Sequence, residues 1–279
     1  WIEEGLASFS PAVITLLRLV FGALTLGVLP PARRGLGRED IPAVALLGLI
    51  WMALPFLLFP IAQQWIDSSL AGMINGGVPI FAAVVAALVV RRLPGSKQLV
   101  GIGLGFLGVL LVGLPVVQHA RSTALGAGLV LLATALYGIA INVAAPLQQK
   151  YGALPVLLRA QLFAIAFTLI PGLVAVRGSS WDLSSFAAMV PLGCLGTGLA
   201  FYSMTTLVGR VGPSRGAITI YFVPIVAIVL GAVVRDESIA ALSLVGTALV
   251  LIGAYLTSRH QPGPAPPEPS RASDLVSSG

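Results

Sequence analysis

Charged residues are scarce in this chain, and their scarcity excludes an ordinary soluble fold. Only 9% of the 279 residues are charged, whereas 57% are hydrophobic and the mean hydropathy is +0.98. A value this high over the whole chain cannot come from one anchor attached to a soluble domain. The sequence therefore predicts an integral membrane protein that uses lipid as its solvent over nearly its whole length.

Metal-binding and catalytic patterns are also missing. The single cysteine, Cys194, lies in an apolar run, so neither a disulfide framework nor a cysteine metal site is available. The HEXXH, phosphate-loop, CxxC and serine-elbow patterns do not occur. We therefore expect no metal, no cofactor and no enzyme activity. The competing hypothesis, a membrane enzyme acting on lipid or isoprenoid substrates, would normally need paired carboxylates, histidines or a metal site.

Apolar stretches long enough to span a bilayer, which takes about 20 helical residues, make up most of the sequence. Short polar or Gly/Pro connections join them and leave no room for a soluble domain. The tail after them is rich in Pro and Ser and is typical of disorder. The predicted spans are residues 12–30, 41–64, 69–90, 98–117, 125–148, 155–176, 184–207, 213–234 and 240–257.

The basic residues are distributed unequally between the two sides of such a bundle. If the first span runs inward, eleven Lys and Arg residues fall on one side and three on the other. This bias places the loops PARRGLGRED and RRLPGSK and the C-terminal tail in the cytoplasm. Orientation thus accounts for the net charge of +6, and we expect the lipid bilayer rather than nucleic acid as the partner.

An internal repeat relates the two halves of the chain. At a shift of 145 positions, SSLAGMINGGVPIFAAVVAALVV overlays PSRGAITIYFVPIVAIVLGAVV, and LVGIGLGFLGVLL overlays LVGTALVLIGAYL. Near a shift of 143, RLVFGALTL overlays QLFAIAFTL. Shared patterns at one register are typical of a structural repeat. The paired residues are Pro79 with Pro224, Gly101 with Gly246, Gly108 with Gly253, and Arg18 with Gln161.

The repeat predicts an all-α, ten-helix fold of five plus five helices. Nine spans are present, and we expect the missing partner of the span 125–148 to precede Trp1. The predicted units are 1–117, the first repeat without its first helix, 124–257, the second repeat, and 258–279, a disordered cytoplasmic tail. Because five is odd, the halves must have opposite orientations in the membrane, as in secondary transporters.

Candidate substrate-binding residues follow from the helix breaks that such folds place near the midplane. Pro79 and Pro224 deprive the Asn75 and Ile220 carbonyls of their helical donors. Only two charges, Arg18 and Arg159, fall inside spans. Packing kinks and helix-to-helix hydrogen bonds are the alternative for these groups. The full candidate set is Arg18, Trp51, Asn75, Pro79, Tyr137, Asn142, Gln161, Tyr202, Thr219, Tyr221 and Pro224.

These segments resemble the EamA-type family of the drug/metabolite transporter superfamily. The matching stretches are PAVITLLRLVFGALTL, AQQWIDSSLAGMINGGVPIFAAVVAALVV with QLVGIGLGFLGVLLVG, and GRVGPSRGAITIYFVPIVAIVLGAVVRDES with LSLVGTALVLIGAYL. One departure is that Arg91 and Arg92 stand where the family usually carries Glu, whereas the second half keeps Glu237.

The resemblance implies a permease of the bacterial inner membrane with both termini in the cytoplasm. It implies transport, often export, of small metabolites such as amino acids by alternating access. A lipid-linked carrier flippase and a non-transporting membrane protein of the same fold stay open as alternatives, and so does association into a homodimer.

Overall fold

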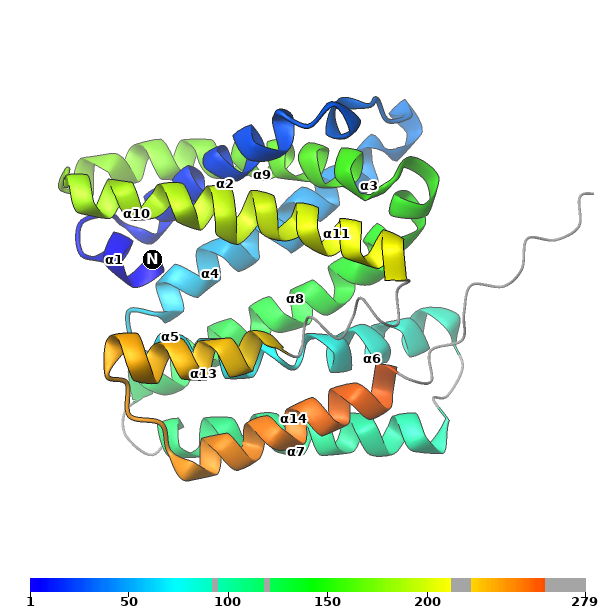
Figure 1. Cartoon of the computed structure of the whole chain (residues 1–279), viewed down its shortest axis with the longest axis vertical. Helices are drawn as coiled ribbons and strands as arrows, with labels where there is room; N and C mark the ends of the chain where they lie inside the picture. Colours follow the sequence, from blue (N-terminus) through cyan, green and yellow to red (C-terminus); the bar gives the residue numbers. More distant parts are fainter. Residues whose placement is uncertain (92–94, 118–120, 212–221, 259–279) are drawn as a thin grey trace, which may run out of the picture.

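The computed structural model describes residues 1–91, 95–117, 121–211 and 222–258. All regular structure in these ranges is helical (Figure 1). Six helical segments are long and apolar enough to cross a membrane, and three shorter apolar helices accompany them. Together they correspond to the nine spans that hydropathy predicts.

The first repeat contributes four rods of helix. The short helix α1 (Ile2–Leu6) precedes α2 (Pro11–Gly27). After the 3-10 turns η1 (Pro30–Arg33) and η2 (Arg38–Asp40), the second rod comprises α3 (Ile41–Leu47), the π-helical turn η3 (Gly48–Ala53) and α4 (Leu54–Ala62). The third rod is α5 (Ser68–Asn75) with α6 (Val78–Val90), and the fourth is α7 (Ser96–Val117).

The second repeat begins with the two longest helices, α8 (Arg121–Tyr151) and α9 (Ala153–Ala175), which ends in η4 (Val176–Gly178). The next rod comprises α10 (Leu183–Gly193), the π-helical turn η5 (Cys194–Leu199) and α11 (Ala200–Val211). Helices α13 (Phe222–Arg235) and α14 (Ala241–Ser258) complete the described chain. Only the part of predicted span 213–234 from Phe222 onward lies inside the described residues.

Several predicted boundaries differ from the structure by a few residues, and two of them have a clear form. The first span was expected to reach residue 30, but α2 ends at Gly27 because Pro30 and Pro31 begin the turn η1. The span predicted at 125–148 lies within a longer helix, α8, which continues over the polar residues Gln148, Gln149 and Lys150.

Helices α7 and α14 show how the two repeats are related. A Cβ placed on Gly108 would lie 2.6 Å from the Gly246 carbonyl oxygen, and one on Gly246 would lie 2.7 Å from the Gly108 carbonyl oxygen. Gly101 and Gly253 approach each other in the same way. Gly101 pairs with Gly253 and Gly108 with Gly246, so the helices are antiparallel. The shift of 145 carries Gly101 onto Gly246 and Gly108 onto Gly253, so it maps each contact pair onto the other. This two-fold relation between antiparallel helices confirms the predicted inverted repeat.

Helices α2 and α9 are related by the same two-fold symmetry, but with a different shift in residue number. A Cβ on Gly48 would lie 2.6 Å from the Ala160 carbonyl oxygen, and one on Gly193 would lie 2.8 Å from the Arg18 carbonyl oxygen. Gly48 and Gly193 correspond at the shift of 145, so the residues that they contact, Ala160 and Arg18, are also equivalent. Their shift is 142. The pairing of Arg18 with Gln161 that the sequence predicted is wrong by one residue.

The rods form two groups in Figure 1, with α4 and α8 passing between them. One group contains α2, α3, α9, α10 and α11, and the other contains α5, α6, α7, α13 and α14. The two groups are joined at the end of the bundle that contains α1, because Arg235, the last residue of α13, forms ion pairs of 2.7 Å with both Glu3 and Glu4 of α1. We call this end the α1 end.

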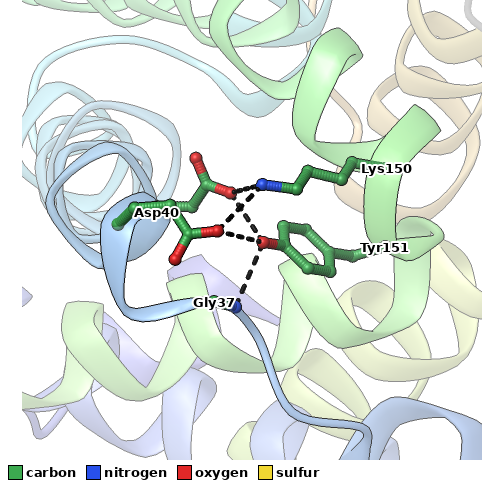
Figure 2. Close-up of polar contacts among 5 residues, drawn as sticks. Gly37, Asp40, Lys150 and Tyr151 are labelled. Atoms are coloured by element: carbon green, nitrogen blue, oxygen red, sulfur yellow. Dashed lines mark hydrogen bonds and ion pairs between the residues drawn. The ribbon is translucent and has the colours of Figure 1, made fainter.

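The opposite end of the bundle is held by a polar cluster between the η2 segment and the end of α8 (Figure 2). Lys150 Nζ lies 2.7 Å from Asp40 Oδ2 and 3.1 Å from Glu39 Oε1. The Tyr151 hydroxyl donates to Asp40 at 2.7 Å and accepts from the Gly37 amide at 3.1 Å. The charged loop between the first two rods is thereby fixed against α8.

Candidate functional site

Arg18 lies in the middle of α2 and is the deepest charged side chain of the described bundle. Its Nε donates a hydrogen bond of 2.9 Å to Thr197 Oγ1, and its guanidinium carbon lies 3.7 Å from the centroid of the Phe56 ring. In the described part of the chain, no carboxylate lies within ion-pair distance of Arg18, and neither Nη nitrogen donates a hydrogen bond. Arg18 is thus held in place but not neutralised.

The π-helical turn η5 positions the hydroxyl that holds Arg18. Thr197 is fully buried, and its hydroxyl lies 3.3 Å from the Leu192 carbonyl oxygen, five residues earlier. A hydroxyl can donate one bond and accept another. Thr197 can therefore donate to its own helix and accept from Arg18, and π turns often occur at such functional positions.

Phe56, on the other side of Arg18, is positioned through a proline. Pro60 lies four residues after Phe56 inside α4 and has no N–H, so the Phe56 carbonyl lacks its helical donor. The buried Thr15 hydroxyl lies 2.9 Å from this carbonyl oxygen and 2.8 Å from that of Pro11, so its one proton is shared between the two acceptors. This contact holds α4 against α2 and keeps the Phe56 ring beneath the guanidinium.

Aromatic side chains lie around this arginine. Tyr137 of α8 stacks on Phe59 of α4, with ring centroids 6.3 Å apart, about one turn along α4 from Phe56. Trp51 of η3 meets Phe201 of α11 edge to face at 5.8 Å. Trp51, Tyr137 and Phe201 all pack against one buried cluster that includes Phe56.

Gln161 of α9 lies against α2 beside Arg18. Its Nε2 donates 3.1 Å to the Leu19 carbonyl oxygen, and Gly22 leaves the space that the amide occupies. The side chain is fully buried, yet its Oε1 accepts no hydrogen bond from the described residues. An unpartnered amide oxygen at this depth is costly unless water or another donor reaches it.

A second group of predicted residues surrounds the break between α5 and α6. Helix α5 ends at Asn75, and α6 begins at Val78 with Pro79 in its first turn. Within the described ranges, the Asn75 carbonyl accepts no backbone hydrogen bond, and its buried Oδ1 has no partner. A Cβ placed on Gly76 would lie 3.1 Å from Pro224 Cγ, so this break touches α13 at its buried proline.

Helix α8 separates the two groups. A Cβ on Gly77, in the break, would lie 3.8 Å from Thr134 Cγ2, one turn before Tyr137. No hydrogen bond or ring contact between described residues joins Asn75 to Arg18. The structure therefore brings Arg18 and Tyr137 together and places Asn75 and Pro224 together on the other side of α8.

The remaining predicted residues have different surroundings. Asn142 donates 2.9 Å to the Ala82 carbonyl oxygen of α6 and 2.9 Å to that of Gly138 on its own helix, so both amide hydrogens are used and one of them joins α8 to α6. Tyr202 is 36% exposed on α11. Thr219 and Tyr221 lie outside the described residues. Two cavities of about 410 and 600 Å³ lie at the α1 end, and none of the predicted residues lines either one.

Sequence reasoning missed Thr197, Phe56 and Thr15 as parts of the Arg18 site. Pro60 marks the free Phe56 carbonyl in the sequence and could have drawn attention to that residue. Thr197 lies 179 residues from Arg18 and carries no comparable signal.

Comparison with known proteins identifies the family. The model described as "EamA-like transporter family" matches residues 1–114 and 124–259. The chain belongs to this family. The resemblance seen in the sequence is confirmed, and the protein is a multi-pass membrane transporter by family.

Relatives of this EamA-like transporter align over most of their length. An uncharacterized transporter of Archaeoglobus fulgidus is 23% identical over 93% of both chains. A probable terminal-alkyne amino-acid exporter of Streptantibioticus cattleyicolor is 28% identical, covering 94% of this chain and 89% of the relative. A probable amino-acid metabolite efflux pump of Escherichia coli is 23% identical, covering 91% and 88%.

A crystal structure in the comparison shares the fold of this EamA-like transporter. It superposes with a TM-score of 0.61 at 18% sequence identity and covers 89% of this chain and 88% of its own. At this identity the likeness supports the architecture alone.

Proposed function

We propose that this EamA-like transporter exports small metabolites, amino acids or compounds related to them, by alternating access. The observation that carries the proposal is the two-fold relation between oppositely oriented repeats, with polar groups and helix breaks where the repeats meet. Two halves of the same fold in opposite orientations can exchange conformations, and the exchange would open a central site to alternate sides.

The polar groups near the repeat interface supply the chemistry of that central site. Among the described residues, Arg18, Asn75 and Gln161 each present hydrogen-bonding atoms without a partner inside membrane spans, where an unused donor or acceptor is costly. A polar substrate or water would use these atoms. We propose the substrate route among the predicted residues Arg18, Trp51, Asn75, Pro79, Tyr137, Gln161, Tyr202, Thr219, Tyr221 and Pro224, with Asn142 supporting it from the α6–α8 contact.

Two relatives support the substrate class through their names, which refer to an amino-acid exporter and an amino-acid metabolite efflux pump. The sequence alternatives are a lipid-linked carrier flippase and a membrane protein that transports nothing. A membrane protein that transports nothing would not account for the cation on α2 that lacks a carboxylate partner among the described residues, whereas an anionic solute, or the phosphate group of a lipid-linked carrier, could pair with it.

The test is transport by the full-length protein in liposomes. Radiolabelled amino acids, sugars and nucleosides are screened, with and without an imposed pH gradient, beside protein-free liposomes. Saturable movement of amino acids or related metabolites supports the proposal. Movement of a fluorescent lipid alone would favour the flippase, and no movement of any probe would contradict a transport function.

A further inference from the structure

The environment of Arg18 differs from that of the other cation inside a predicted span. Arg159 reaches the exposed edge of the bundle, where its Nη2 donates 3.2 Å to the Arg33 carbonyl oxygen. Arg18 lies several turns inside α2, faces the Phe56 ring and has no carboxylate partner among the described residues. A cation in the middle of a span calls for an anion or water that this part of the protein does not provide.

The donor groups of Arg18 show which kind of anion fits. A guanidinium has five N–H donors, of which one, on Nε, is used by Thr197. The Phe56 ring covers one face of the guanidinium plane, so the edge with the two Nη nitrogens remains for a ligand. A planar edge of this kind matches a carboxylate through two parallel hydrogen bonds.

The arginine is also held ready for such a ligand. Thr197 fixes Nε and is itself bonded to the Leu192 carbonyl oxygen, while Thr15 fixes the backbone of Phe56. Both supports lie at helix irregularities, the π turn η5 and Pro60. Prior fixing of a side chain lowers the entropy that binding must overcome.

Aromatic groups next to the arginine suit the remainder of a small organic acid. Tyr137 stacks on Phe59, about one turn along α4 from the Phe56 ring that covers Arg18. A ligand carboxylate at the Nη edge would therefore have aromatic surface beside it for an apolar substituent or an ammonium group.

We propose that Arg18 binds the carboxylate of the transported substrate, so that the protein selects small carboxylates, including free amino acids, over uncharged analogues. This proposal rests on the proposed transport function, because only a transporter has a transported substrate. Binding of the carboxylate can nevertheless be tested without transport.

The experiment measures ligand-induced thermal stabilisation of the purified full-length protein with matched probes. Each amino acid that stabilises the protein is compared with its amide and with the corresponding acid that lacks the amino group. We expect the free carboxylates to bind and the amides to bind about tenfold more weakly or not at all. Equal binding of acid and amide would overturn the proposal.

Variants then assign the discrimination to Arg18. Arg18→Met is expected to abolish the preference for acid over amide, and Arg18→Lys to weaken acid binding about tenfold, because an ammonium cannot form the two parallel bonds. Arg159→Met, the matched loss of an intraspan cation, should leave the preference intact. If Arg18→Met does not fold, Arg18→Lys and Thr197→Val provide the test. A preserved preference in the folded Arg18 variants would contradict the proposal.

The two proposals fail separately. If the protein transports neutral solutes and Arg18→Met still transports them, the transport function stands and the carboxylate site is wrong. If wild-type protein binds carboxylates in an Arg18-dependent way but moves none of them in liposomes, the carboxylate site stands and the transport function is wrong.

Discussion

Gly108 of α7 and Gly246 of α14 lie so close that each occupies the space where a side chain on the other would have to go. The nearest atoms to a Cβ at either position are backbone, namely the partner carbonyl oxygen and an amide nitrogen one turn further on. Backbone cannot move aside as a flexible side chain can. This contact joins the two repeats along the edge of the bundle (Figure 1).

Gly108→Val should therefore destabilise the protein by about 1–3 kcal/mol or more, since overpacked sites are costly and this one is bounded by backbone. Thermal unfolding in detergent, followed by size-exclusion chromatography, measures the loss. Gly103→Val is the matched control on the same helix, because no atom lies within 4 Å of a Cβ at Gly103. Equal stability of the two variants would argue against the close approach of α7 and α14.

Glu237, in the loop after α13, caps the start of α5. Its carboxylate accepts hydrogen bonds of 3.1 Å from the Ser68 amide, 2.6 Å from the Ser68 hydroxyl and 2.9 Å from the Ser69 amide. Burial raises the pKa of Glu237, but these hydrogen bonds outweigh it and leave the pKa below its usual range. The negative charge also suits the positive end of the helix dipole.

Glu237→Gln should lower the melting temperature by a few degrees near neutral pH. A carboxylate with a lowered pKa contributes its full stability above its unfolded pKa of about 4.3, and the contribution is lost as the pH falls through the folded pKa. The wild type should therefore lose stability in acid more steeply than the variant. Melting curves at about pH 3 to pH 8 measure this, and parallel curves would contradict the cap.

Asp67 must be separated from this effect because its pKa shifts the other way. Burial raises the pKa of Asp67, and the nearby Glu237 and Glu3 carboxylates raise it further. A raised carboxyl pKa means that protonation stabilises the fold as the pH falls through the folded value. Asp67→Asn should remove this gain in weak acid while keeping the Glu237-dependent loss at lower pH.

Part of the architecture could be predicted because close contacts leave glycines and prolines at fixed spacings. Gly101, Gly108, Gly246 and Gly253 gave the shift of 145, and their contacts confirm it. Helices α2 and α9 have no such markers at equivalent positions, so apolar similarity paired Arg18 with Gln161, one residue off. The shift changes from 142 to 145 because the chain from Ala160 to Gly193 is three residues longer than the chain from Arg18 to Gly48.

The candidate site was harder to predict because its geometry depends on hydrogen bonds between distant segments. The turn η5 directs Thr197 toward Arg18, yet nothing in CLGTGL distinguishes a π turn from an ordinary helix. Asn142 illustrates the converse. Its amide at membrane depth suggested a cavity, but the Ala82 and Gly138 carbonyls already use both amide hydrogens.

The orientation of the bundle remains a prediction from the distribution of basic residues. The C-terminal end of α8 lies at the end of the bundle opposite to α1 (Figure 1), and Lys150 there pairs with Asp40 (Figure 2). The positive-inside bias places that end in the cytoplasm. Reporter fusions after Arg38, Lys97 and Arg259 should report cytoplasm, and fusions after Ser122 and Ser180 the other side. A cytoplasmic signal at Ser180 would reverse the assignment.

Asn75 and Asn142 provide a paired test of which polar groups serve the substrate. Asn75→Leu keeps the side-chain volume but removes an amide whose Oδ1 has no partner among the described residues. Substrate binding should weaken by about 1–3 kcal/mol if a direct hydrogen bond is lost, with little change in melting temperature. Asn142→Leu should do the reverse, lowering the melting temperature with little change in binding, because it removes the hydrogen bond that joins α8 to α6.

Cysteine chemistry checks the same assignment without a known substrate. In a Cys194→Ala background, a cysteine replacing Asn75 should react with a small membrane-permeant thiol reagent, since an unpartnered buried amide indicates access by water. A cysteine replacing Asn142 should react more slowly, because that position is enclosed by the α6–α8 contact. Any transported solute should slow the reaction at position 75 alone. If position 75 is inert and Asn75→Leu transports normally, the break between α5 and α6 is a packing feature and Asn75 does not belong to the substrate route.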